Sequence, residues 1–293
     1  MRIVFIGAVQ FSRACLAKLL DIGAEVVGAC TLEDSSFNAD HVDLAPFCRQ
    51  KAIPVTYASD INSLEILGWI RSLRPDVIFC FGWSRLLKSE LLGLAPLGVV
   101  GFHPAALPAN RGRHPIIWAL VLGLEETAST FFFMDEGADS GDILSQRLIP
   151  ISEEDDAESL YGRITDVALE QLEEFVPALA SGSFQRLPQD HRRANVWRKR
   201  GKNDGRIDWR MSAHSIHNLV RGLSRPYVGA HFEYLDSKVI VWRTAIVEGY
   251  PENMEPGKVL VADSRGIVVK AGEGAIRIMS MEPLAQPEAG TYL

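Results

Sequence analysis

Residues 77–103 read VIFCFGWSRLLKSELLGLAPLGVVGFH, and two apolar runs within this stretch decide the fold. Val77–Phe81 contains almost no polar residue, which is typical of a strand that is covered on both faces of its sheet. Gly98–His103 is a second run of this kind, and it ends on a histidine. Strands buried on both faces belong to sheets with helices on each side, so the two runs predict an α/β fold.

The sequence before this stretch alternates between strand and helix patterns. Arg2–Ile6 and Glu25–Cys30 are short runs rich in β-forming residues, and apolar residues recur at helical spacing over Phe11–Leu20. Leu64–Leu73 predicts another helix. This alternation predicts a doubly wound, mostly parallel, Rossmann-like sheet. Ligands of such sheets bind beyond the carboxyl ends of the strands, which is where His103 is expected.

The second half of the chain changes character near residue 183. Before that point, Thr127–Met134 and Asp142–Pro150 are expected to be strands, and Ala157–Ala180 a long helix. A stretch rich in lysine and arginine follows, and then short strand patterns separated by turn signals, which predict a barrel-like β domain. We therefore expect a catalytic domain over 1–183, a linker over 184–205 and a smaller, mainly β domain over 206–293.

Composition and charge narrow the class of protein. The chain has 293 residues, of which 47% are hydrophobic and 23% are charged, as in ordinary globular proteins. Its net charge of −7 argues weakly against nucleic acid as an obligate partner. The sequence shows no apolar run long enough to span a membrane, no leader pattern and no metal-type spacing among its four cysteines. These features predict a cytoplasmic protein with free thiols and no membrane partner.

The strand that ends at His103 runs into an unusual loop, HPAALPANRGRHP, over residues 103–115. The loop contains three prolines, two histidines and two arginines. Prolines fix the backbone, so the loop is expected to be rigid and to hold a catalytic group well. Most single histidines are structural, but the position at the end of a buried strand favours a catalytic role for His103.

An acidic turn follows over residues 135–142, with carboxylates at Asp135, Glu136, Asp139 and Asp142. Solvated turn residues and a metal loop are the alternatives, but the spacing of a calcium-binding EF-hand is absent and we expect no metal. A carboxylate beside a histidine orients the ring and favours its protonated form, which suits proton transfer. The first strand–helix turn lacks the GxGxxG pattern, which argues against a nicotinamide cofactor.

Two stretches together resemble a known family. FHPAALPANRGRHPIIWAL, followed by ETASTFFFMDEGADSGDILSQ, is similar to the signature of the 10-formyltetrahydrofolate-dependent formyltransferases. That family includes methionyl-tRNA formyltransferases and the sugar N-formyltransferases. The later stretch DGRIDWRMSAHSIHNLVRGLSRPYVGAHF resembles the start of the C-terminal domain of the tRNA enzymes. The resemblance therefore covers nearly the whole chain.

This resemblance implies roles for individual residues. The family's catalytic histidine and aspartate match His103 and Asp139, whereas its catalytic asparagine falls on Gly101, which has no side chain. Candidate substitutes are Asn110, Arg113 and above all His114, although His114 is equally well a plain loop residue. The residues that match the family's slot for the pterin ring of the folate are Phe81, Trp83, Arg85, Leu86, Leu87, Asp135, Gly137 and Asp139. Substrate contacts are expected from Gly7, Val9, Arg111 and Arg113.

The resemblance also implies an N-formyltransferase that takes its formyl group from 10-formyltetrahydrofolate and needs no metal. The favoured acceptor is an amino sugar linked to a nucleotide, because FHP after the strand is more like the sugar enzymes. Methionyl-tRNA is the second candidate, because the tRNA enzymes have a similar C-terminal domain. A folate-binding regulator without activity is a third, because Gly101 replaces the asparagine. A homodimer stays open.

Overall fold

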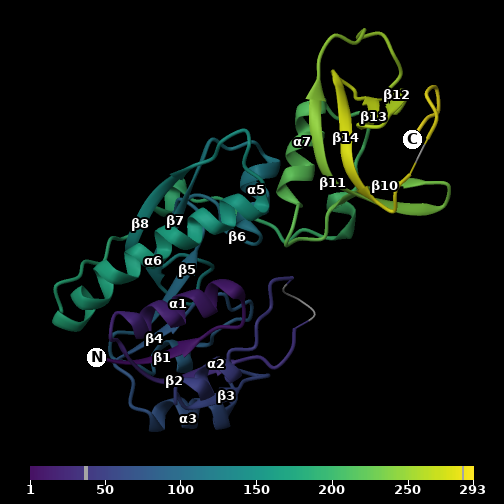
Figure 1. The fold of residues 1–293 in the computed structure, drawn as a ribbon. Coiled ribbons are helices and arrows are strands. Elements are labelled where there is room, and N and C mark those ends of the chain that lie inside the picture. The colour runs from purple at the N-terminus through teal and green to yellow at the C-terminus, as the bar shows by residue number, and fades with distance from the viewer. Residues whose placement is uncertain (36–38, 286) are drawn as a thin grey trace. The chain divides into compact units, whose positions relative to one another are not determined.

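The structure, a computed structural model, describes residues 1–35, 39–285 and 287–293 (Figure 1). The chain folds into two compact units, each assembled from segments that are distant in the sequence. The first unit comprises Met1–Gly112, Thr127–Ile149 and Gly162–Trp197, and the second comprises Arg113–Glu126, Pro150–Tyr161 and Arg198–Leu293. The domain boundaries that the sequence suggests at 183 and 206 stay predictions.

The first unit is built on a seven-stranded sheet. Its strands are β1 (Arg2–Ile6), β2 (Glu25–Thr31), β3 (Val55–Tyr57), β4 (Val77–Cys80), β5 (Val99–His103), β7 (Glu126–Phe133) and β8 (Ile143–Pro150). Hydrogen bonding places them in the order β3-β2-β1-β4-β5-β7-β8. The ladders from β3 to β5 are parallel, whereas β7 pairs with β5 in antiparallel fashion. The expected doubly wound, mostly parallel sheet is therefore confirmed.

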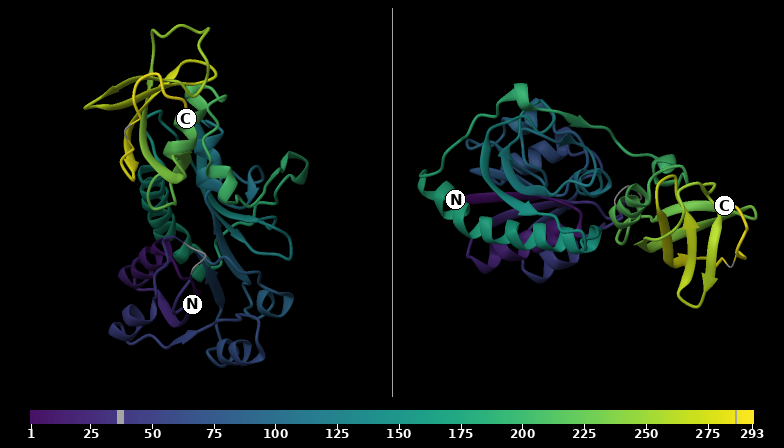
Figure 2. Two further views of the ribbon diagram at one scale, coloured as in Figure 1. Left: turned by 90° about the vertical axis from the view of Figure 1, so that its right-hand side faces the viewer. Right: turned by 90° about the horizontal axis from the view of Figure 1, so that it is seen from above.

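Helices cover both faces of this sheet, as strands buried on both sides require. They are α1 (Gln10–Asp21), α2 (Ala45–Gln50), α3 (Leu64–Ser72), α4 (Ser89–Leu92) and α6 (Ala157–Ser181). On one face the core is aromatic: the ring of Phe175 in α6 lies 4.8 Å from that of Phe131, and Phe11 of α1 stacks on Phe102 at 4.2 Å. Figures 1 and 2 show α6 running along the sheet.

The opposite face of the sheet has an aliphatic core. Ile66 and Ile70 of α3 and Leu91 of α4 pack there with residues of β1, β4 and β5, among them Val99. Side chains along a strand alternate between the two faces, so Gly101 and His103 point to the same face as Val99. This alternation brings the candidate histidine to the face that α3 and α4 cover.

The second unit is mainly β, as expected. Its strands β10 (Ala230–Tyr234), β11 (Ser237–Val247), β12 (Val259–Asp263), β13 (Gly266–Lys270) and β14 (Ala275–Glu282) form an antiparallel sheet in the order β10-β11-β14-β13-β12. Helix α7 (Ala213–Gly222) packs on β11, and α5 (Pro115–Val121) packs on α7. Ile216 and Leu219 of α7 join Val241 and Ile276 of the sheet in one buried core.

The segment between α6 and the second unit's sheet has little regular structure. It contains the short elements η1 (His191–Arg193), β9 (Val196–Trp197) and η2 (Lys202–Gly205). β9 pairs in parallel with β6 (Arg111–Gly112), which lies in the loop after β5. Most residues from 182 to 199 are exposed, but Gln189 is buried. Up to Trp197 the segment belongs to the first unit, and Gln189 and β9 are among its contacts there.

The four cysteines are free and buried, as expected from their spacing. Burial raises the pKa of Cys30 to about 12, and burial together with the charge of Asp43 raises the pKa of Cys48 to about 11. Thiolate chemistry is therefore disfavoured at these positions. Within the described ranges, none of the helices combines the length and the apolar character that a membrane span requires.

We expect limited proteolysis to cleave the protein first between Gly182 and Arg206. Backbone there is exposed and carries few ladder hydrogen bonds, so local opening costs less free energy than opening of the sheet. Trypsin has exposed arginines in this segment, Arg192 and Arg198 among them. Mass spectrometry of the first fragments checks this expectation, and early cleavage within Val77–Phe81 would contradict it.

Candidate active site

The candidate site lies at the carboxyl edge of the seven-stranded sheet. The chain builds the sheet outward from β1 to β3 and then resumes on the other side of β1 with β4 and β5, so its direction reverses between β1 and β4. Such a reversal opens the crevice in which parallel sheets bind ligands. His103 is the last residue of β5, next to β4, and is only 4% exposed. The predicted histidine therefore lies where a ligand of this fold is expected.

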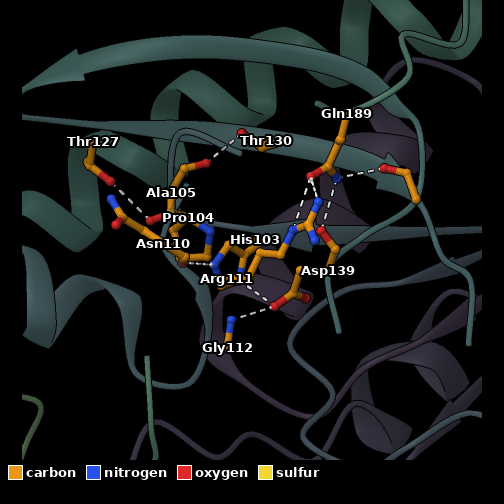
Figure 3. A network of polar contacts seen from close by, with 11 residues as sticks. His103, Pro104, Ala105, Asn110, Arg111, Gly112, Thr127, Thr130, Asp139 and Gln189 are labelled. Carbon is orange, nitrogen blue, oxygen red and sulfur yellow. Dashed lines mark hydrogen bonds and ion pairs between the residues drawn. The ribbon is translucent and has the colours of Figure 1, made fainter. Parts of the chain in front are cut away.

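Two oxygen atoms hold the imidazole of His103 in place (Figure 3). Nε2 lies 2.8 Å from the backbone oxygen of Asn110, and Nδ1 lies 3.6 Å from Oδ2 of Asp139. A carbonyl oxygen only accepts hydrogen bonds, so Nε2 must carry a proton and donate it. Nδ1 is then the ring nitrogen that faces the carboxylate. The structure thus brings together the two residues that the sequence suggests as a catalytic pair.

The carbonyl of Asn110 reaches His103 because of an unusual backbone conformation. Asn110 has a φ of +64°, in the left-handed region that asparagine tolerates better than most residues. Its backbone N–H donates to Oδ1 of Asn195 at 2.7 Å. The sequence suggests the side chain of Asn110 as a substitute donor, but in the structure it is the backbone oxygen that contacts the histidine.

Asp139 is fixed by its backbone as well as by its carboxylate. Its φ is +52°, and Oδ2 accepts the backbone N–H of Gly112 at 2.8 Å. The side-chain amide of Gln189 donates to the carbonyls of Asp139 and Gly141, at 2.9 and 2.7 Å. Gly141 is required here, because a Cβ atom would lie 1.8 Å from the carbonyl oxygen of Phe133. One buried glutamine therefore holds the backbone at Asp139 and at Gly141, two residues later in the same turn.

Asp135 and Gly137, which the resemblance assigns to folate binding, make contacts within the same turn. Oδ1 of Asp135 accepts the N–H of Gly137 at 3.0 Å and the hydroxyl of Ser140 at 2.7 Å. Their contact with a folate stays a prediction. Among the residues that the structure describes, no three His, Cys, Asp or Glu side chains are arranged to hold a metal ion.

The loop after His103 is tied to strands β7 and β8. The buried hydroxyl of Thr130 donates to the carbonyl of Ala105 at 2.7 Å, and the amide of Gln146 donates to the carbonyl of Leu107 at 3.0 Å. Figure 3 shows the contact between Thr130 and Ala105 near the histidine. Together with the prolines, these hydrogen bonds explain how an irregular loop can hold the carbonyl of Asn110 against the imidazole of His103.

Arg111, expected to contact substrate, instead supports the site from within. The residue is 7% exposed, and its Nη2 and Nε donate to Oε1 of Gln189 at 2.6 and 3.2 Å. Nη2 also lies 3.1 Å from Nδ1 of His191. Arg111 therefore positions Gln189, which in turn positions Asp139. Sequence reasoning missed Gln189 and His191 because they belong to the stretch that it interprets as a linker.

The side chain of Met134 occupies the space that an amide side chain at position 101 would enter. A Cβ atom at this position would lie 2.7 Å from Cγ and 3.0 Å from Sδ of Met134, the residue directly after β7. The backbone N–H of Met134 donates to the carbonyl of Val99 at 2.7 Å, which fixes the backbone of Met134. An apolar thioether thus occupies the place beside Gly101.

A cavity of about 240 Å³ opens between the carboxyl ends of β1, β2 and β4. Ala8 and Leu32 line it, and so do Trp83 and Arg85, two residues that the resemblance assigns to the folate. Of the other predicted folate contacts, Phe81 and Leu87 are buried in the core, whereas Leu86 is 74% exposed.

Gly7 and Val9, which are predicted to contact substrate, flank Ala8 of the cavity wall in the sequence, and both are tightly packed. A Cβ atom on Gly7 would lie 2.6 Å from the carbonyl oxygen of Phe81, so glycine is needed for the close approach of β1 and β4. Val9 is buried, and its N–H lies 3.2 Å from Oγ of Ser12. A substrate contact from either residue stays a prediction.

His114 and Arg113 belong to the second unit. His114 precedes α5 with a φ of +57°, and its buried Nδ1 has no hydrogen-bond partner among the described residues. Burial lowers the pKa of His114, and the charges of Arg113 and Arg200 lower it further, so the neutral ring is favoured. The role of His114 as a substitute donor, and that of Arg113 in substrate binding, stay predictions.

Comparisons with solved structures support the fold. HypX from Aquifex aeolicus, solved in complex with tetrahydrofolic acid, matches 96% of this chain with a TM-score of 0.70 and 19% identity, and this chain spans 44% of HypX. WlaRD, a sugar 3N-formyltransferase solved with dTDP and 5-N-formyl-THF, matches 97% of this chain and 99% of its own, with a TM-score of 0.71 and 16% identity. At these identities the likeness concerns the fold alone.

Sequence comparisons establish the family. A methionyl-tRNA formyltransferase from Caldanaerobacter subterraneus subsp. tengcongensis is 33% identical over 96% of this chain and 92% of its own length. A methionyl-tRNA formyltransferase from Acetivibrio thermocellus is 32% identical over the same shares. Residues 1–176 match the formyl transferase domain, and residues 199–290 match the formyl transferase C-terminal domain. The chain therefore belongs to the formyl transferase family, and it is a folate-dependent enzyme.

Proposed function

We propose that this enzyme transfers the formyl group of 10-formyltetrahydrofolate to the amine of a nucleotide-linked amino sugar. The observation that carries formyl transfer is the pair of His103 and Asp139, held beside the crevice at the carboxyl edge of the sheet. The net charge of −7 and the loop sequence after His103 favour the sugar acceptor. A solved N-formyltransferase from Helicobacter canadensis, in complex with folinic acid and dTDP-3-aminofucose, supports this choice at the level of the fold.

The chemistry that this pair supplies follows from its geometry. When the amine attacks the formyl carbon, a C–N bond forms, the formyl oxygen becomes an oxyanion and the nitrogen must lose a proton. Nδ1 of His103 serves this step, because Nε2–H is held by the carbonyl of Asn110. A proton on Nδ1 stabilises the oxyanion, and Asp139 relays the amine's proton to the leaving nitrogen as the second C–N bond breaks.

Methionyl-tRNA is the second candidate acceptor, because the relatives that are 32–33% identical are methionyl-tRNA formyltransferases. Binding of tRNA needs cations that are free to meet phosphates. In the second unit, several cations are engaged with carboxylates instead: Arg198 with Asp204, Arg210 with Asp208, and Arg265 and Arg277 with Asp263. This pairing ranks tRNA below the sugar.

The remaining expectations concern regulation, assembly and location. A folate-binding regulator has no need of a histidine paired with a carboxylate, and the curated relatives are enzymes, so we set that alternative aside. Homodimer formation and a cytoplasmic location stay predictions.

We expect the enzyme to formylate a dTDP-linked amino sugar and to use charged initiator methionyl-tRNA poorly. The reason is the acidic net charge, together with the ion pairs that engage several arginines of the second unit. The rate at which tetrahydrofolate is released, monitored by chromatography with each acceptor in turn, measures the preference between the two acceptors. Efficient formylation of the tRNA with no activity on any sugar nucleotide would reverse the ranking.

We expect His103→Asn to lower kcat by about 10²–10³-fold, because it removes a preorganised donor to the oxyanion. Asp139→Asn should be similarly damaging, since a neutral amide cannot relay the proton. Folate affinity, measured by calorimetry, should change little in both variants. Glu136→Gln is the matched control, because Glu136 is an exposed carboxylate of the same turn. Full activity of His103→Asn would remove the basis of the mechanism.

We expect Asn110→Gly to retain activity and Asn110→Val to lower kcat by about tenfold or more. Glycine adopts a φ of +64° without strain, whereas a β-branched residue does not, so valine should move the carbonyl away from Nε2 of His103. Steady-state kinetics and thermal unfolding of both variants separate this effect from loss of folding. Equal loss of activity in both variants, with the fold intact, would show that the Asn110 side chain, and not its carbonyl, is what the site needs.

A further inference from the structure

We propose that the indole N–H of Trp83 donates a hydrogen bond to the formyl oxygen as that oxygen becomes an oxyanion. The inference rests on the proposed formyl transfer and adds a catalytic residue to it. Trp83 would then act on the reacting atoms themselves, beyond any role as a wall of the folate site.

The reaction needs a donor that His103 cannot supply alone. Nε2–H of His103 is committed to the carbonyl of Asn110, so the ring offers the substrate one N–H at most. An oxyanion in a buried site is stabilised best by two or more preorganised donors. Gly101 offers no side chain, and Met134 beside it is apolar. A second donor must therefore come from elsewhere at this edge of the sheet.

Other donors near this edge are already used within the protein. The hydroxyl of Ser12 donates to the carbonyl of Phe81 at 2.6 Å, and that of Thr130 donates to the carbonyl of Ala105 at 2.7 Å. Nε1 of Trp83 differs from both, because it is buried and has no acceptor among the described residues. Buried donors without an acceptor are rare in native proteins, which points to a ligand atom as the missing acceptor.

The position of Trp83 fits this role. The residue follows β4, the strand next to β5, and it lines the cavity at the point where the strand order reverses. Its side chain packs against the aliphatic cluster of the sheet face that α3 and α4 cover, and so does Met134. Gly101 and His103 point to that same face. The unpaired N–H is thus on the side of the sheet where the formyl group must meet His103.

The chemistry of an indole suits the task. Its N–H donates but never accepts, and the indole does not ionise in the physiological range. Trp83 could therefore stabilise the oxyanion without entering the proton relay between the amine, His103 and Asp139. This division separates charge stabilisation from proton transfer in one small site.

The first test is Trp83→Phe, which keeps an aromatic ring and removes the donor. We expect kcat to fall by about 10²-fold, with KM for the folate changed by less than about threefold. Trp242→Phe is the matched control, because Nε1 of Trp242 in the second unit is also buried and has no hydrogen-bond partner in the described part of the chain. That variant should keep the wild-type kcat. Thermal unfolding of both variants checks that the fold is intact.

A rescue experiment tests whether the missing function is a hydrogen bond. Met134→Ala removes the side chain that would meet a Cβ atom at position 101, and Gly101→Asn then places an amide there. When both substitutions are added to Trp83→Phe, we expect kcat to rise at least about tenfold above that of Trp83→Phe alone, because the new amide can donate to the oxyanion. The same pair in the wild-type background should give little gain, because the donor is already present.

A binding experiment tests the contact without any acceptor. In protein labelled with ¹⁵N at the indole nitrogens, the resonance missing from Trp83→Phe identifies Trp83. We expect this resonance to shift more with 10-formyl-5,8-dideazafolate than with 5,8-dideazafolate, which lacks the formyl group. If the wild-type enzyme formylates none of the acceptors, the proposed function is wrong. The spectrum needs no acceptor, so it tests the contact between Trp83 and the formyl group separately.

Three results would overturn the inference. Wild-type kcat in Trp83→Phe would show that the N–H is not used in catalysis. A raised KM for the folate in Trp83→Phe, with kcat unchanged, would show that Trp83 acts in folate binding only. Equal spectral shifts with the formylated and the unformylated folate would lead to the same conclusion. A silent Trp83→Phe beside a damaging His114→Ala would make His114 the donor instead.

Discussion

The hydrogen bond from Nε2 of His103 to the carbonyl of Asn110 is the interaction on which the rest of the site depends. It fixes the ring and leaves Nδ1 to face Asp139. Much of the surrounding structure serves to keep that carbonyl in place. Thr130 and Gln146 hold the loop from β7 and β8, and the left-handed conformation of Asn110 turns its oxygen toward the ring.

The other partner of the histidine is held by a relay of buried polar groups. Arg111 binds Gln189, and Gln189 binds the carbonyls of Asp139 and Gly141. Buried polar side chains are costly unless they are satisfied, so each member of this relay depends on the others. The segment after α6, which has little regular structure, thereby supports the candidate site through one glutamine.

Much of the fold could be predicted from the sequence because strands buried on both faces leave a clear apolar pattern. That pattern located β4 and β5 and placed His103 at the carboxyl edge. Asp139 was recognised through the family resemblance rather than through any local signal. The carbonyl of Asn110 could not be predicted, because every residue has a carbonyl and only the folded loop selects one. Gln189 was missed for a similar reason, since one polar residue in an exposed stretch carries no signal.

Arg111 shows the limit of reasoning from residue type. An arginine in a loop beside a catalytic histidine suggests an anion site, yet this guanidinium is buried against Gln189. Likewise, the loss of the family's asparagine at Gly101 is visible in the sequence, but its replacement by the side chain of Met134 is visible only in the structure. In both cases, the surroundings of the residue are set by packing partners that are distant in the sequence.

The most direct test of this account is a crystal structure of the enzyme with a stable 10-formyl folate analogue. The account predicts that the formyl oxygen lies within about 2.7–3.1 Å of Nδ1 of His103 while Nε2 stays on the carbonyl of Asn110. A formyl oxygen bonded to Nε2, or one placed away from the imidazole altogether, would contradict it.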